Sequence, residues 1–278
     1  MLQEILIPVA ILGGLGLFFG LCLSYASKKF GVKVDERIGK VRDVLPGANC
    51  GACGFTGCDG YAEAVVSGNA DINKCTVGGR DVMVSIGEIL GKDTSTSSVE
   101  CKVGRVMCGA DNGKTRTKYD YSGIKDCTAA TALYGGPTAC MYGCIGMGDC
   151  AKACPFGAIV VERGVARVLA AKCKGCGKCV EVCPRNIIKI VPKEKQYTVR
   201  CNNPQRGNFV MKVCKVGCIG CRKCSKVCEA GAITNDGFVA RINPELCTNC
   251  GKCMEVCPNH VINKYPVCSD EGPAAVNE

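Results

Sequence analysis

An uncharged apolar run opens the chain. From Ile5 to Tyr25 no residue carries a charge, and about 20 apolar residues in a helix are enough to cross a bilayer core of about 30 Å. Met1 to Glu4 contain no Lys or Arg and no small-x-small cleavage site follows the run, which argues against a cleaved signal peptide. The pattern predicts a transmembrane anchor over residues 1–27, with a buried helix of a soluble protein as the alternative.

Three lysines follow the apolar run and indicate its orientation. Lys28, Lys29 and Lys33 come directly after it, and positive charge gathers on the cytoplasmic side of membrane helices. We therefore expect a single-pass membrane protein whose remaining residues lie on the cytoplasmic side. Thiols are kept reduced in the cytoplasm, so disulfide bonds are not expected.

Beyond the anchor, short apolar stretches alternate with cysteine-rich loops. The stretch A-I-V-V-E-R-G-V-A-R-V, from Ala158 to Val168, has two apolar runs around a glycine and predicts a hairpin of two short strands. Each cysteine run is expected to open a short helix after its second or third cysteine. This alternation of strand, cysteine loop and helix predicts an α+β fold built from small units.

Cysteine is the most unusual feature of the composition. The chain has 27 cysteines among 278 residues, no Trp and an aromatic content of 5%. Small segments with so few aromatic residues bury too little apolar surface to fold unaided, so metal centres or disulfides must help to hold them. The composition therefore favours several small domains over one large one.

The cysteines reveal an internal repeat with a period of 74 residues and no gaps. Nine of them recur at this one offset, and the turn residues Gly157 and Gly231 keep the same register. The first copy contains Cys127, Cys140, Cys144, Cys150, Cys154, Cys173, Cys176, Cys179 and Cys183, and the second contains Cys201, Cys214, Cys218, Cys224, Cys228, Cys247, Cys250, Cys253 and Cys257.

The spacing within each copy is typical of cluster-binding proteins. Two runs, starting at Cys218 and Cys247, have the pattern C-x2-C-x2-C-x3-C, in which three thiolates bind one [4Fe-4S] cluster and the fourth binds its neighbour. Each copy resembles a two-cluster bacterial ferredoxin. The resemblance implies three ligand sets: Cys218, Cys221, Cys224 and Cys257; Cys247, Cys250, Cys253 and Cys228; and Cys173, Cys176, Cys179 and Cys154.

A fourth site, in the first copy, departs from this pattern because Met147 stands where the second copy has Cys221. Either Cys140 supplies the missing thiolate or the site is altered or empty. We favour the first alternative, which gives the ligand set Cys140, Cys144, Cys150 and Cys183. Cys214, the counterpart of Cys140, is then left without a partner.

A separate cysteine group precedes the repeat. Cys50, Cys53 and Cys58 lie in a glycine-rich stretch, and Cys75 follows a segment expected to be helical. This spacing alone fits either zinc or a cluster. A zinc-stabilised or disulfide-stabilised, membrane-tethered binding module is the alternative of another class, although runs of four cysteines with one histidine in the whole chain are untypical of zinc sites.

The order of these features resembles the B subunit of the Rnf complex, an ion-translocating membrane ferredoxin:NAD oxidoreductase. The resemblance covers almost the whole chain and rests on the apolar run, the stretch P-G-A-N-C-G-A-C-G-F-T-G-C from Pro46 to Cys58, and the ferredoxin-like runs. It implies an electron-transfer subunit without a catalytic site in a bacterial cell membrane, which relays electrons between soluble ferredoxin and the other subunits. A polyferredoxin subunit of another membrane enzyme, a hydrogenase or a quinone reductase, is the alternative.

The expected domains are the anchor (1–27), a small [4Fe-4S] domain held by Cys50, Cys53, Cys58 and Cys75 (28–90), a linker and connecting segment (91–123) and two ferredoxin-like modules (124–197 and 198–278). Five [4Fe-4S] clusters are expected. Cys108 and Cys201 both follow residues typical of a strand, so these two cysteines could be equivalent despite the 74-residue register, with Cys127 in an insertion. A sixth cluster, held by leftover cysteines, is the alternative to buried free thiols. The leftover cysteines are Cys101, Cys108, Cys127, Cys201, Cys214 and Cys268.

Other functions find little support in the sequence. No G-x-G-x-x-G follows a strand and no flavin motif is present, so we expect neither an NAD nor a flavin site on this chain. The formal net charge is +10, but about −2 on each of five clusters brings it to roughly zero. The basic residues are interleaved with the cysteine loops, which argues against nucleic-acid binding.

Overall fold

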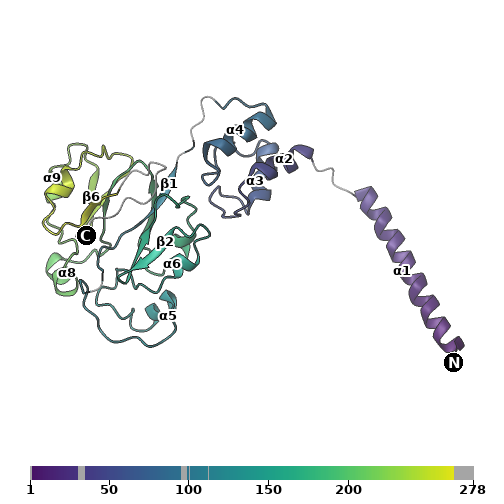
Figure 1. Ribbon diagram of the computed structural model, residues 1–278, viewed down its shortest axis with the longest axis horizontal. Helices are drawn as coiled ribbons and strands as arrows, with labels where there is room; N and C mark the ends of the chain where they lie inside the picture. Colours follow the sequence, from purple (N-terminus) through teal and green to yellow (C-terminus); the bar gives the residue numbers. More distant parts are fainter. Residues whose placement is uncertain (1, 31–34, 95–98, 100, 112, 266–278) are drawn as a thin grey trace.

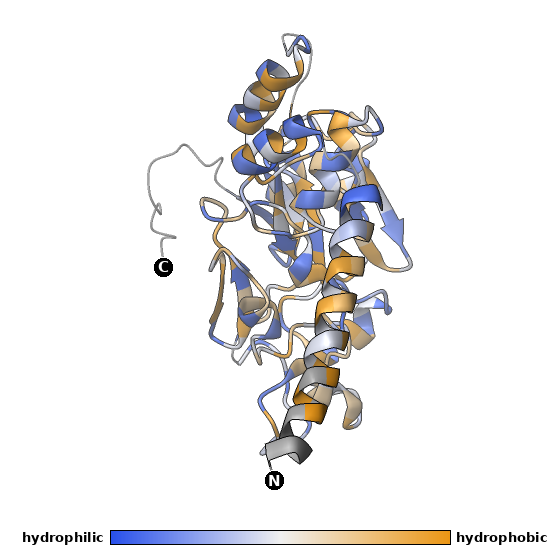
Figure 2. Cartoon of the chain, turned by 90° about the vertical axis from the view of Figure 1, so that its right-hand side faces the viewer, coloured by the Kyte–Doolittle hydropathy of each residue, from blue (hydrophilic) through white to orange (hydrophobic). Residues whose placement is uncertain are grey.

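The computed structural model describes residues 2–30, 35–94, 99, 101–111 and 113–265. It begins with α1 (Leu2–Phe30), a helix that extends away from the other elements (Figure 1) and is predominantly apolar (Figure 2). Within it, Ile11–Lys29 is long and apolar enough to cross a membrane, and none of this stretch is buried. The predicted apolar helix is therefore confirmed; Lys33 lies outside the described residues.

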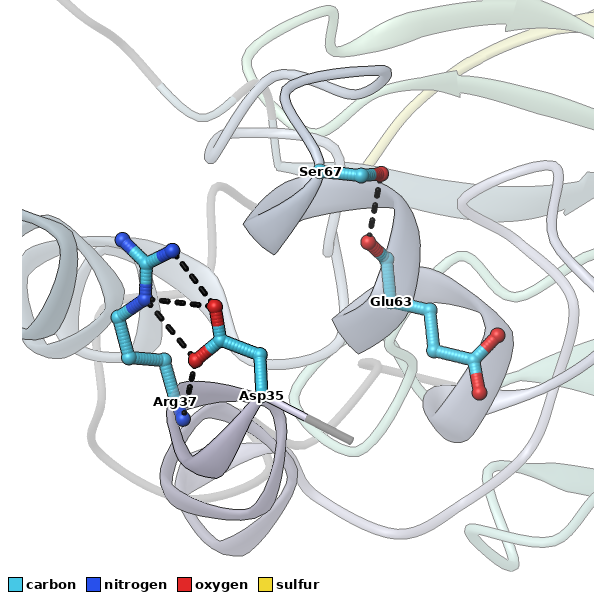
Figure 3. A network of polar contacts seen from close by, with 4 residues as sticks. All are labelled: Asp35, Arg37, Glu63 and Ser67. Carbon is cyan, nitrogen blue, oxygen red and sulfur yellow. Dashed lines mark hydrogen bonds and ion pairs between the residues drawn. The ribbon is translucent and has the colours of Figure 1, made fainter. Parts of the chain in front are cut away.

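Three helices, α2 (Glu36–Val44), α3 (Cys58–Val66) and α4 (Gly79–Leu90), form a small domain after α1. Their apolar faces meet around Tyr61 and Ile86, which are fully buried. Asp35 caps α2 by accepting from the Arg37 backbone N–H at 2.9 Å, and the Ser67 hydroxyl donates to the Glu63 carbonyl at the end of α3 at 2.7 Å (Figure 3). The helix expected between Cys58 and Cys75 is confirmed as α3.

Each ferredoxin-like module consists of two antiparallel pairs of strands. In the first, β1 (Lys102–Val106) pairs with β4 (Ile188–Pro192), and β2 (Ile159–Glu162) forms a hairpin with β3 (Val165–Val168). In the second, β5 (Tyr197–Val199) pairs with β8 (Ile262–Lys264), and β6 (Ile233–Asp236) with β7 (Val239–Ile242). The predicted hairpins and the α+β class are thus confirmed.

The first strand of the first module lies outside the 74-residue register. Cys108 follows β1 as Cys201 follows β5, and these two cysteines lie 93 positions apart, 19 more than the repeat period. The segment expected as a linker and connection, residues 91–123, thus contains β1; residues 95–98 of that segment lie outside the described residues. The additional residues carry α5 (Cys127–Ala132), for which the second module has no counterpart at the same register.

Four helices of four residues each hold the third cysteine of each run. They are α6 (Asp149–Lys152), α7 (Lys178–Glu181), α9 (Lys223–Lys226) and α10 (Lys252–Glu255), and the predicted short helices are confirmed. Their cysteines are part of the core of each module, packed with apolar residues such as Ile188 and Val239. The remaining helix, α8 (Gly207–Val213), precedes the first cysteine run of the second module.

The two modules pack against each other through the segment between Cys108 and Cys140, which we call the inserted segment because it is 19 residues longer than the segment between Cys201 and Cys214. The Lys215 N–H donates to the Lys114 carbonyl at 2.8 Å, and the Arg116 N–H donates to the Val213 carbonyl at 3.1 Å. Thr115 forms an isolated antiparallel bridge with Cys214. These contacts bring the cysteines beside β1 close to those beside β5 and α8.

Candidate functional site

The structure gathers twenty-four of the cysteines into six groups of four, each named here by its first member. The groups are Cys50, Cys53, Cys58 and Cys75; Cys154, Cys173, Cys176 and Cys179; Cys127, Cys144, Cys150 and Cys183; Cys108, Cys140, Cys201 and Cys214; Cys218, Cys221, Cys224 and Cys257; and Cys228, Cys247, Cys250 and Cys253. Every described cysteine is a free thiol. Cys22 and Cys101 belong to no group, and Cys268 lies outside the described residues.

The space inside these groups suits a cluster better than a single ion. Five groups line cavities of 330–410 Å³, counted with the part open to solvent. Among the described residues, no three His, Cys, Asp or Glu side chains are close enough to hold one metal ion. Four thiolates on zinc lie about 3.8 Å apart, because the Zn–S bond is about 2.3 Å. Soft thiolate donors around a wider space fit a [4Fe-4S] cluster.

The Cys50 group is built by the loop before α3 and the turn before α4. The Asn49 side chain accepts from the Cys58 N–H at 2.8 Å, and the Gly78 N–H donates to the Cys75 sulfur at 3.4 Å. Gly57 is required beside Asn49, since it has a φ of 143° and a Cβ there would lie 3.1 Å from the Asn49 oxygen. The four cysteines expected in this domain are thus brought together.

The Cys218 and Cys228 groups unite the sulfurs that the ferredoxin resemblance implied. Cys257, from the second run, joins the first three cysteines of the first run, and Cys228 joins the first three of the second. The Val261 N–H donates to the Cys257 sulfur at 3.3 Å. An amide that donates to sulfur stabilises the thiolate, which is the form that binds iron.

The Cys154 group has the same construction in the first module. The Ala158 N–H donates to the Cys154 sulfur and the Gly104 N–H, from β1, donates to the Cys173 sulfur, both at 3.4 Å. The thiols of Cys154, Cys173 and Cys176 lie near Cys179, whose pKa is raised to about 12 by burial and by these neighbours. This grouping also matches the expected set.

The site beside Met147 differs from the expected set. Cys127, not Cys140, lines the cavity of Cys144, Cys150 and Cys183, although Cys144 also lines the neighbouring cavity that contains Cys140. Burial raises the pKa of Cys127, while the backbone amides of Asp149, Met147 and Gly148 favour its thiolate. The Asp149 carboxylate also accepts from the Cys127 N–H at 2.7 Å. The inserted segment thus brings a thiol to the loop where the second module has Cys221.

Cys140 belongs to a group that lies between the modules. Cys108 and Cys140 come from the first module and Cys201 and Cys214 from the second, and all four are buried, at 6–8% exposure. The Asn203 amide donates to the Cys140 sulfur at 3.7 Å, and the Thr115 hydroxyl donates to the Cys214 sulfur at 3.8 Å. The sequence did not predict this group of four, although it did indicate that Cys108 and Cys201 are equivalent positions in the two modules.

Burial keeps these thiols neutral in the metal-free chain. It raises the pKa of Cys144 and Cys150 to about 12 and that of Cys201 and Cys253 to about 11. Thiolates bind iron, so a cluster must displace these protons as it binds. The positive charge of iron and the hydrogen bonds to sulfur would then stabilise the thiolates in place of water.

Five of the groups are neighbours in the two module cores: one core contains cysteines of the Cys154, Cys127 and Cys108 groups, and the other contains cysteines of the Cys108, Cys218 and Cys228 groups. After burial, which is the larger cause in each case, a thiol of the adjacent group raises the pKa of Cys176, Cys150, Cys144, Cys201 and Cys253. The five pairs are Cys50 with Cys176, Cys179 with Cys150, Cys108 with Cys144, Cys218 with Cys201, and Cys224 with Cys253. The groups follow the order Cys50, Cys154, Cys127, Cys108, Cys218, Cys228.

Family models match the same regions of the chain. A model of an Fe-S cluster matches residues 45–77, one 4Fe-4S dicluster domain matches residues 172–232 and 217–261, and another 4Fe-4S dicluster domain matches residues 137–184. The ferredoxin-type domains predicted from the cysteine runs are thus confirmed, as is the assignment of [4Fe-4S] clusters to them.

Whole-chain relatives extend this similarity. The chain is 42% identical over 244 residues to the B subunit of the Na+-translocating ferredoxin:NAD+ oxidoreductase complex of Acetobacterium woodii, covering 87% of this chain and 73% of the relative. It is 41% identical over 238 residues to the B subunit of the ion-translocating oxidoreductase complex of Methanosarcina acetivorans, covering 85% and 89%. The proton-translocating counterpart of Clostridium ljungdahlii is 39% identical over 218 residues, covering 78% and 76%.

Proposed function

This chain belongs to the family of B subunits of ion-translocating oxidoreductase complexes, and we propose that it relays electrons between soluble ferredoxin and the other subunits of a ferredoxin:NAD+ oxidoreductase. The observation that carries the proposal is the series of six cysteine groups, five of which are neighbours in the cores of the two modules. It runs from the domain that follows the apolar helix to the far end of the second module.

Six groups of four thiols support six [4Fe-4S] clusters, one more than the five expected from the sequence. A bound cluster would take up and release one electron at a time. The protein would hold each cluster by four thiolates, and its backbone amides donate to the sulfur ligands, as at Cys154 and Cys257. In this proposal Cys127 completes the site beside Met147, and Cys140 serves the group between the modules.

The Cys108 group has a special place in the series because it is the link between the two modules. Its Cys108 lies near Cys144 of the first module, and its Cys201 lies near Cys218 of the second. An electron that crosses from one module to the other would therefore pass this group, whose cysteines come from both modules.

The rest of the proposal concerns the assembly. We infer that α1 crosses the membrane once and that the cluster domains lie on the cytoplasmic side, because Lys28 and Lys29 are at the end of α1 that leads into these domains. NAD and flavin would bind other subunits. The chain itself would have no catalytic site. Coupling to Na+ or H+ transport, named for the relatives from Acetobacterium and Clostridium, would belong to the whole complex.

Iron and acid-labile sulfide per chain, measured on the anaerobically purified protein, test this function. Six clusters give about 24 of each, with a broad visible absorption that reduced ferredoxin bleaches. Zinc in place of iron would refute electron transfer, and so would a fully loaded protein that reduced ferredoxin cannot reduce.

A further inference from the structure

The four short helices that carry the third cysteines differ in charge. Counted with the residue before each helix, α6, α7 and α10 have one basic and one acidic residue each, so their charges cancel. The corresponding segment of α9 has three basic residues and no acidic one, namely Arg222, Lys223 and Lys226. Its counterpart in the first module has Gly148, Asp149 and Lys152 at the same positions.

Arg222 occupies a backbone position that the other three helices reserve for glycine. The residue before each helix is left-handed, with a φ of 90° at Gly148, 86° at Gly177, 83° at Gly251 and 58° at Arg222. A residue with a Cβ is strained in this conformation, whereas glycine is not. Arg222 therefore places a positive charge next to Cys221, where the other three helices have an uncharged glycine.

The charged residues surround an exposed ligand of the Cys218 group. Cys221, Arg222, Lys223 and Lys226 are all exposed. Phe238, 38% exposed, lies against the same loop, since a Cβ on Gly220 would be 2.7 Å from the Phe238 carbonyl oxygen, and the Arg206 guanidinium lies 5.8 Å from the Phe238 ring. We call Arg206, Cys221, Arg222, Lys223, Lys226 and Phe238 the basic face.

The positive charge of the basic face is available to a partner. Among the ion pairs of the described residues, none involves Arg206, Arg222, Lys223 or Lys226. The nearby acidic residues Glu229 and Asp236 are instead paired with Lys252 and Arg241. An exposed aromatic side chain within a rim of arginine and lysine is the composition of a small, transient protein interface.

We propose that the basic face is the docking surface for a small acidic electron carrier, which exchanges one electron with the cluster held by Cys218, Cys221, Cys224 and Cys257. This inference rests on the proposed function and adds the place of contact. Opposite charges would steer the carrier to Cys221, an exposed ligand of this cluster, and the Phe238 ring would give the encounter its apolar contact.

The test compares charge removal at two left-handed arginines. In R222G/K223Q/K226Q the basic face loses three charges. The control R163G makes the same arginine-to-glycine change in the β2–β3 turn of the first module, where Arg163 is exposed with a φ of 49° and its counterpart is Gly237. The probe is a reduced acidic [2Fe-2S] ferredoxin, mixed with the full chain in detergent. Its strong visible circular dichroism separates it from [4Fe-4S] clusters.

We expect the wild-type rate of probe oxidation to fall with salt. The triple variant should lose about tenfold or more of the low-salt rate and most of its salt dependence, while R163G stays within about twofold of wild type. Iron content should be unchanged. The single variant R222G, which replaces a strained residue by the glycine of the other three helices, should melt no lower than wild type and lose a smaller part of the rate.

Two outcomes would overturn the inference. If wild type oxidises the probe and the triple variant matches it in rate and salt dependence, the basic face is not the docking surface, although the electron-transfer function stands. If fully loaded wild type does not oxidise the probe at all, the proposed function fails and the docking surface fails with it. Should the triple variant bind less iron, R222G alone decides, and an unchanged rate in R222G refutes the proposal.

Discussion

The two ferredoxin-like modules have the same arrangement of strands and short helices but complete their sites differently. The second module fills its Cys218 group from its own two runs, whereas the first has Met147 in place of Cys221 and recruits Cys127 from an inserted segment. The same insertion carries residues that pack on the second module beside Cys214. One departure from the repeat thus repairs a site within the module and joins it to its neighbour.

A cluster site is therefore defined by where sulfur atoms meet, not by their register along the chain. Cys140 and Cys214 are true counterparts at the 74-residue offset, and they meet across the module boundary. Cys127 has the register of Cys201 but a different role, because Cys108 occupies the position equivalent to Cys201 after the first strand.

Removal of the Cys108 group, which joins the modules, should change electron transfer more than any other substitution. The double variant C108S/C214S takes one ligand from each module and should bind about 20 iron per chain instead of about 24. Electrons supplied at the second module should then reach its two clusters rapidly and the other three slowly. Iron analysis, and rapid-mixing reduction followed by EPR, measure both effects.

The matched control for this experiment is C101S, because Cys101 is exposed and belongs to none of the six groups. It should retain all of the iron and the wild-type reduction kinetics. A C108S/C214S protein with full iron content would contradict the assignment of a cluster to this group.

The second prediction converts the first module into a copy of the second. C127S should lose the cluster beside Met147, about 4 iron per chain, and the double variant C127S/M147C should regain it, because residue 147 has the repeat position of Cys221. The cluster should return because the Cys127 thiol lies beside the backbone amides of Met147 and Gly148. A thiol on residue 147 itself would therefore lie close to the one that it replaces. Iron retained by C127S would instead favour Cys140 as the ligand.

Much of this architecture followed from the sequence, because each feature has a local pattern. The apolar run from Ile5 to Tyr25 became α1, and glycine between two apolar runs became the β2–β3 hairpin. Cysteines at every third residue are also a local pattern, and they predicted the Cys154, Cys218 and Cys228 groups that the structure contains.

The sites that the sequence did not resolve depend on contacts between distant segments. Cys127 reaches Cys144 only because α5 folds back onto the Met147 loop, and no spacing rule describes that return. The Cys108 group requires two modules to pack together. The similar residues around Cys108 and Cys201 did indicate their equivalence, but the offset of 93 residues concealed it from a search at one period.

The third prediction tests whether the two modules share the same backbone constraints. Gly146 and its counterpart Gly220 have positive φ, and a Cβ at either would collide with the carbonyl of the adjacent hairpin turn, at Gly164 or at Phe238. G146A and G220A should each cost more than about 2 kcal/mol, from backbone strain and overpacking together. The temperature at which each variant loses its visible cluster absorption under anaerobic conditions ranks the stability of G146A, G220A and wild type.

The control pair for these substitutions is Gly157 and Gly231, which also have positive φ but open space around a Cβ. G157A and G231A should cost about 1 kcal/mol from the backbone alone. If alanine at Gly146 is tolerated as well as alanine at Gly157, the close approach between loop and hairpin does not constrain the module.

Asp126 should have a weaker effect than these glycines. It has no counterpart in the second module, because Arg200 stands at the equivalent position of the repeat. Its carboxylate caps α5 by accepting from the Ala129 N–H at 2.7 Å, and this hydrogen bond lowers the pKa of the carboxyl group. A carboxyl with a depressed pKa stabilises the fold above its unfolded pKa, and the contribution is lost as pH falls through the folded value.

D126A should therefore release one cluster of six to a chelator faster at neutral pH, because Cys127 is the first residue of α5. D126N, which keeps an acceptor oxygen, should fall between D126A and wild type, and the differences should shrink only below about pH 4. Equal release rates at neutral pH would mean that the Asp149 contact alone holds Cys127 in place.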